Sequence, residues 1–130
     1  MKELLAIAGI IITATALLLT GVAEGIPISH ASISTDKGTY LSREQMLISL
    51  NISSRVAANV TIDIKGIGNR LEISQERHLQ AGNNNLTFTY TTPECYGCAG
   101  ISPGMYNITA YITYDNNTIE SPVYWIKLDK

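Results

Sequence analysis

Residues 106–114 read YNITAYITY, and this stretch decides the fold. Apolar or aromatic side chains occupy every second position, and Asn, Thr and Tyr fill the positions between them. A period of two predicts a β-strand with one buried face and one solvated face. The same alternation recurs at residues 46–53, 56–64 and 86–90, a last strand is predicted near 123–128, and weaker strands near 31–34 and 70–74.

Turn-forming residues separate these strands. Clusters of Gly, Asn and Asp lie at residues 36–38, 66–69, 82–84 and 115–117, and such residues accept the backbone angles that tight turns need. About seven strands joined by turns are typical of a two-sheet sandwich. With 130 residues the chain has room for one domain. The sequence therefore predicts an all-β fold, a single immunoglobulin-like antiparallel β-sandwich.

The N-terminus carries an export signal. Lys2 precedes an uncharged run over residues 4–23, and no basic residue follows until Lys37. This asymmetry predicts a hydrophobic export helix with the remainder of the chain outside the membrane. Small residues at 21–23 predict cleavage after Ala23, but the run is also long enough to span a bilayer as an uncleaved anchor.

The predicted organisation follows from these two signals. Residues 1–23 form a signal peptide or N-terminal membrane anchor, residues 24–34 an N-terminal arm or first strand, and residues 35–130 the sandwich. The expected location is extracellular or at the cell surface, with membrane contact only through the N-terminal segment if it is uncleaved. The net charge of −2 and the absence of a Lys/Arg cluster argue against nucleic acid as a partner.

Two short motifs resemble a known family. Residues 35–40, TDKGTY, and the following Glu44 resemble the opening of macroglobulin-like and related prokaryotic surface immunoglobulin-like domains. Those domains read Thr-Asp-Lys-Pro-x-Tyr and then Gly-Glu, so here Gly38 replaces the proline and Arg43 the glycine. Residues 103–106, PGMY, resemble the turn before their penultimate strand. The resemblance implies the sandwich fold, a surface role, and a corner tyrosine at Tyr106 whose hydroxyl bonds back to the turn.

Five N-glycosylation acceptors are present, each an Asn-x-Ser/Thr sequence without a middle proline. In four of them the asparagine and the hydroxyl residue fall on the predicted solvated face. A half-buried strand often has the same polar-apolar-polar pattern by chance, so the alternative is that a motif is present but not glycosylated. The acceptors are Asn51, Asn59, Asn85, Asn107 and Asn116.

The only cysteines, Cys95 and Cys98, share one loop. Outside the cytoplasm a local disulfide is the expected state. A redox role needs a following helix, and residues 100–104 contain Gly and Pro instead. A zinc site needs further ligands, and neither His30 nor His78 has the spacing for one.

The sequence contains no complete catalytic motif. Residues 100–104, GISPG, match the nucleophile-elbow pattern, but Pro103 lacks the backbone N–H that an oxyanion hole needs after Ser102. We therefore expect no enzyme activity, no metal and no cofactor. A sandwich of this size binds through its end loops and edges, which makes the loop over residues 91–104, with Tyr96 and Pro103, the expected binding loop.

The functional expectation is a non-catalytic cell-surface or secreted module for adhesion or structural interaction. Its partner would be a protein or glycan at the cell surface, or a second copy of the chain. The alternative is a subunit of an extracellular filament or surface layer, in which the apolar arm over residues 25–34 adds to an exposed sheet edge of a neighbour.

Overall fold

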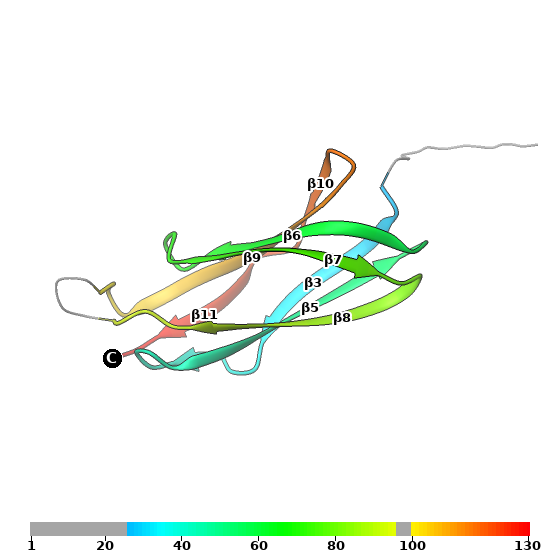
Figure 1. Ribbon diagram of the computed structural model, residues 1–130. Coiled ribbons are helices and arrows are strands. Elements are labelled where there is room, and N and C mark those ends of the chain that lie inside the picture. The colour runs from blue at the N-terminus through cyan, green and yellow to red at the C-terminus, as the bar shows by residue number, and fades with distance from the viewer. Residues whose placement is uncertain (1–25, 96–99) are drawn as a thin grey trace, which may run out of the picture.

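The structure is a computed structural model that describes residues 26–95 and 100–130. All regular elements in these residues are β-strands, which form two sheets packed face to face (Figure 1). No helix in this part of the chain is long and apolar enough to cross a membrane. The predicted export segment, residues 1–23, and the predicted loop residues Tyr96 and Cys98 lie outside the described residues.

The smaller sheet has three antiparallel strands. They are β3 (Ile28–Thr35), β5 (Gln45–Ser54) and β8 (Gly82–Thr91), in the order β3-β5-β8. The alternation predicted for residues 46–53 is confirmed, because the apolar set that begins with Met46 is buried and the residues between point outward. The turn predicted at 82–84 is instead the beginning of β8.

The larger sheet has six strands. Its order is β4 (Thr39–Tyr40), β11 (Tyr124–Leu128), β9 (Gly104–Tyr114), β6 (Ala58–Gly66) and β7 (Leu71–Leu79). β10 (Asn117–Glu120) pairs with the far end of β9 and forms a projecting hairpin with it (Figure 1). The β4–β11 pair is parallel, and the other pairs are antiparallel.

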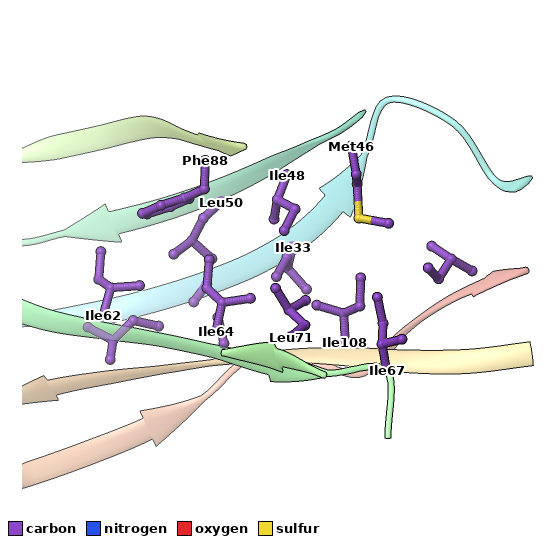
Figure 2. Packing of buried hydrophobic residues seen from close by; sticks show 14 of the residues in the cluster. Ile33, Met46, Ile48, Leu50, Ile62, Ile64, Ile67, Leu71, Phe88 and Ile108 are labelled. Carbon is purple, nitrogen blue, oxygen red and sulfur yellow. The ribbon is translucent and has the colours of Figure 1, made fainter. Parts of the chain in front are cut away.

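The core lies between the two sheets. Figure 2 shows Ile48 and Leu50 of β5 pointing toward Ile62 and Ile64 of β6, with Phe88 closing the layer. These side chains are at most 3% exposed. Burying one such side chain contributes about 1.5–3 kcal/mol, so the period-two pattern of each strand is also the main source of its stability.

The N-terminal segment belongs to this core. The sequence predicts an arm or first strand over residues 24–34, and in the structure Ile28–Thr35 is a strand that pairs with β5. Ile28, Ala31 and Ile33 are buried among the core side chains. Donation of this strand to a neighbouring molecule would therefore require it to leave its own sheet.

The TDKGTY motif occupies the crossing from β3 in one sheet to β4 in the other. The Tyr40 ring is fully buried, and its hydroxyl donates to the Asp36 carboxylate and accepts the Lys37 backbone N–H at 2.9 Å. Asp36 also accepts the Leu47 backbone N–H at 3.1 Å. The hydrogen bond from the Tyr40 hydroxyl lowers the pKa of Asp36 most, and the hydrogen bond from the Leu47 N–H lowers it further. These hydrogen bonds thus fix the point at which the chain crosses from one sheet to the other.

Arg43, which stands where the family has glycine, adopts a backbone conformation that glycine favours. Arg43 has a φ of 59° in the turn between β4 and β5, a conformation that glycine adopts without steric cost. Glu44 closes the same turn, since its carboxylate accepts the Leu41 backbone N–H at 2.8 Å and pairs with Lys37.

Candidate functional site: a loop anchored at one end of the sandwich

The first part of the connection between β8 and β9, residues 92–95, is fastened to the turn between β4 and β5, residues 41–44. Thr92, which is 2% exposed, makes the central contacts. Its backbone N–H donates to the Glu44 carbonyl at 2.9 Å. Its hydroxyl donates to the Leu41 carbonyl at 2.6 Å and accepts the Glu44 N–H at 2.8 Å. One threonine therefore joins two segments that are far apart in sequence.

A second layer of contacts extends this anchor toward the loop tip. The Cys95 backbone N–H donates to the Ser42 hydroxyl at 2.9 Å. Arg43 and Glu94 form an ion pair at 2.9 Å between nitrogen and oxygen. Because both side chains are well exposed, this pair adds little stability, and its effect is to orient the surface of the turn.

The cysteine prediction is only partly within the structure. Cys95 is fully buried, and its sulfur lies 3.8 Å from the Pro93 carbonyl oxygen. Its predicted disulfide partner, Cys98, lies outside the described residues, so the disulfide stays a prediction.

The returning side of the loop is held by β9 and the turn after β6. The Tyr106 hydroxyl donates to the Ser102 carbonyl at 2.5 Å, which is the backward bond implied for a corner tyrosine. The Tyr106 ring packs against the core. The Ile101 N–H donates to the Glu94 carbonyl at 2.8 Å and closes the base of the loop. Pro103 is exposed beside this base.

Tyr90 braces the same end of the sandwich from β8. Its hydroxyl donates to the Arg70 carbonyl at 3.0 Å, and an Arg70 nitrogen lies 3.4 Å from the Gly100 carbonyl oxygen. Burial raises the pKa of Tyr90, while the charge of Arg70 acts in the opposite direction. The loop base is therefore tied to both sheets.

The loop and the N-terminal strand lie at opposite ends of the domain. Thr91 pairs with Gln45 at one end of β5, whereas Ile28 pairs with Ser54 at the other end. β5 has ten residues, so the two ends are about 30 Å apart. Figure 1 shows the same separation, with the end of β8 and the beginning of β9 at the end of the sandwich that also holds the C-terminus.

All five acceptor asparagines are exposed. Asn51 and Asn85 are direct partners on β5 and β8, on the outer face of the three-stranded sheet. Asn59 and Asn107 lie on the outer face of the six-stranded sheet, where Asn59 bonds to a histidine of β7 at 2.8 Å. Asn116 has a φ of 69° in the β9–β10 turn. The acceptors are thus spread over both faces and one hairpin tip.

The two histidines stay apart. His30 is exposed on β3, and His78 is exposed on β7 in the other sheet. Among the described residues no three His, Cys, Asp or Glu side chains gather at one point.

Sequence reasoning missed the turn over residues 41–44. Ser42 and the Glu44 backbone make hydrogen bonds with Cys95 and Thr92, which lie about fifty residues away in the sequence. Leu41, which is 53% exposed in this turn, adds an apolar side chain beside the loop. The one sequence signal for this turn is the resemblance at Arg43 and Glu44, which marks its shape but not its contacts.

Comparison with known proteins identifies the fold. No protein-family profile matches the chain, and no curated protein matches it in sequence. A CARDB domain from Pyrococcus furiosus, solved in complex with di-metal ions, matches with a TM-score of 0.56 and 14% identity over 82% of this chain and 97% of that one.

Two larger proteins contain a similar unit. A β-glucosidase from Erythrobacter marinus matches with a TM-score of 0.55 and 16% identity, over 78% of this chain but only 16% of the enzyme. A sporulation control protein from Bacillus subtilis matches with a TM-score of 0.50 and 13% identity, over 79% of this chain and 51% of that protein. Such identities show a shared fold alone. The described residues therefore have an immunoglobulin-like β-sandwich fold.

Proposed function

We propose that this chain is a non-catalytic, extracytoplasmic module that binds a protein or glycan at the cell surface through the loop over residues 92–103 and the turn over residues 41–44. The observation that supports this most is the anchoring of that loop. The described ends of this connection are held by hydrogen bonds of Thr92, Cys95 and Tyr106, and a binding segment whose ends are already fixed loses less entropy when it binds a partner.

The direction of the chain supports the same proposal. The described chain begins at Ile26, at the end of the sandwich opposite the loop (Figure 1). With the N-terminal segment at the membrane, the loop would stand about 30 Å above the point where the domain starts. A loop in that position is the part of the domain that meets a partner first.

Binding of the purified mature chain to its own cells tests this proposal. The variant Arg43→Glu replaces the ion pair with Glu94 by two acidic side chains, and Tyr96→Ala removes the aromatic side chain that the sequence predicts for binding. We expect both variants to lower binding at least about tenfold while thermal unfolding stays close to wild type, since exposed charges contribute little to stability.

A matched control is Glu76→Lys, which reverses a charge at an exposed position of β7, in the half of that strand that lies away from the loop. This variant should bind like the wild type. Equal binding by Arg43→Glu, Tyr96→Ala and the wild type would contradict the proposed site.

Export is the second part of the proposal and rests on the run over residues 4–23. A mature protein whose mass begins at Glu24 would indicate cleavage, and a full-length chain in the membrane fraction would indicate the anchor. Both outcomes agree with the proposal. Protein that is soluble in the cytoplasm with Met1 or Lys2 as its first residue would refute it.

The alternative, a filament or surface layer built by strand addition, has one feature in its favour. β8 is an edge strand of ten residues, and its sequence, GNNNLTFTYT, contains no charged side chain. Uncharged edges of this length pair readily with strands of other molecules. By contrast, the edge strand β7 carries Glu72, Glu76 and Arg77.

The size of the native protein separates the two functions. A single species with the mass of one chain agrees with a binding module. Polymers that survive detergent would favour the filament.

A further inference from the structure

The outer face of the six-stranded sheet carries a cluster of exposed apolar side chains. Met105, Val123 and Trp125 are 58%, 47% and 55% exposed. Trp125 is the only tryptophan of the chain. Its neighbour in sequence, Tyr124, packs against the core, so the strand directs the indole outward. Several exposed apolar side chains gathered on one face are typical of a surface that a bound group or partner covers.

The residue opposite Trp125 is an acceptor asparagine. Trp125 and Asn107 are direct partners in the antiparallel pairing of β11 and β9, so their Cβ atoms lie about 5 Å apart on the same face. Met105 lies two residues before Asn107 on β9 and shares that face. An N-linked sugar on Asn107 would begin directly beside this apolar surface.

The other side of Asn107 is open and polar. There β9 meets the turn after β6, where Gly66 and Gly68 present no side chain. The result is a shallow groove of about 400 Å³, lined by Asn107, by the polar side chains of Lys65, Asn69 and Glu120, and by Val123 of the apolar cluster. A sugar ring has an apolar C–H face and an edge of hydroxyl groups. An indole on one side and polar groups on the other match these two surfaces.

The remaining acceptors have no such surroundings. Asn51 and Asn85 face each other across a pair of strands whose outward neighbours are mainly Ser, Thr and Asn. Asn59 faces His78, and Asn116 lies in a hairpin tip. Asn107 alone among the five has an exposed tryptophan as its direct cross-strand partner.

We propose that an N-linked glycan on Asn107 packs its first sugar against the indole of Trp125 and turns its hydroxyl groups toward the groove formed by Lys65, Asn69 and Glu120. The proposal rests on the export proposed above, because only an exported chain meets the glycosylation machinery. The glycan would then be a built-in part of the sheet surface.

The order of events follows from burial. Ile108 and Thr109, the second and third residues of this acceptor, are 0% and 7% exposed. A transferase that must reach the Thr109 hydroxyl therefore acts before β9 joins the sheet. The same glycan, once attached, would favour the register that brings Asn107 next to Trp125.

Acrylamide quenching of tryptophan fluorescence tests the proposal, because the single tryptophan is the single reporter. The experiment compares protein produced by its own cells as wild type, as Asn107→Gln and as Asn85→Gln. A sugar that covers one face of the indole should lower the quenching constant about twofold. Wild type and Asn85→Gln should share the low value, and Asn107→Gln should show the high one.

Enzymatic or chemical removal of glycans from the folded wild-type protein provides a second measurement that does not depend on a variant. It should raise the quenching constant to the value of Asn107→Gln. Mass spectrometry of the glycopeptides from the same samples reports occupancy at Asn107.

Three results would overturn the inference. They are an unmodified Asn107 in exported protein, an occupied Asn107 with unchanged quenching after deglycosylation, and shielding that survives Asn107→Gln. Each of these leaves the proposed function standing, because export is measured separately by the N-terminus of the mature chain.

Discussion

Replacing Thr92 with valine tests the anchor of the candidate binding loop. Valine has the shape of threonine but no hydroxyl group, so the change removes two hydrogen bonds and leaves the volume nearly unchanged. The lost bonds are those to the Leu41 carbonyl at 2.6 Å and from the Glu44 N–H at 2.8 Å. The backbone bond from Thr92 to Glu44 remains.

The size of the effect follows from burial. Thr92 is 2% exposed, so water does not replace the hydroxyl. A hydrogen bond within a protein contributes about 0.5–1.5 kcal/mol, and two of them give about 1–3 kcal/mol. For a domain of roughly 100 residues, each kcal/mol lowers the melting temperature by about 4–8 °C.

Urea unfolding measures this change against a matched control. Thr91 precedes Thr92 and is exposed on the outer face of β8, so Thr91→Val should change stability by less than about 0.5 kcal/mol. Hydrogen exchange at the Glu44 amide should accelerate in Thr92→Val only. Equal stabilities for Thr92→Val and Thr91→Val would show that the loop is not held as described.

Three further changes test other parts of the structure. Tyr106→Phe removes the hydrogen bond to the Ser102 carbonyl and should lower the free energy of unfolding in urea by about 0.5–1.5 kcal/mol. Tyr111→Phe, on the same strand, should leave it nearly unchanged. Similar losses in both variants would refute the corner role of Tyr106. Because folding lowers the pKa of Asp36, the ionised carboxylate stabilises the fold at pH values above its unfolded pKa of about 3.9, and this contribution is lost as the pH falls through the folded pKa. The difference in unfolding free energy between wild type and Asp36→Asn should therefore shrink below about pH 4. A constant difference down to pH 2 would contradict this role of Asp36. In protein purified from its native compartment, mass spectrometry after alkylation should show one Cys95–Cys98 disulfide. Reducing this disulfide should lower the free energy of unfolding by no more than about 2 kcal/mol, because the ring is small. Two free thiols or a bound metal would exclude the disulfide.

The fold could be predicted where period two runs long enough. The alternation over residues 106–114 and 46–53 lies in β9 and β5 as expected. β4 was missed because two residues show no period, and its pairing with β11 depends on tertiary contacts. β7 runs to Leu79, beyond its predicted end near residue 74. It is an edge strand, and residues 74–76 are exposed without an alternating pattern.

The surface could be predicted less well than the core. Parity places the asparagines of the four acceptors in strands on exposed positions, as predicted, but the hydroxyl residue of one of them, Thr109, is buried. The same parity leaves Tyr124 and Trp125 on opposite faces without saying which is outside. The structure places Trp125 outside and Tyr124 against the core.

The contacts of the loop could not be predicted at all. Thr92 and Ser42 are common polar residues in a sequence rich in Ser and Thr, and their hydrogen-bond partners lie 48–53 positions away. Only the assembled sandwich brings them together. The Tyr106 bond differs, since its partner lies four residues back and the local motif signals it.

The central claim is that this domain stands outside the membrane, and labelling of intact cells tests it most directly. Lys65 and Lys127 are exposed on the outer face of the six-stranded sheet, so a lysine reagent that cannot cross membranes should reach both. We predict that peptides containing these lysines are modified to the same extent in intact and in lysed cells. Modification that appears only after lysis would contradict the claim.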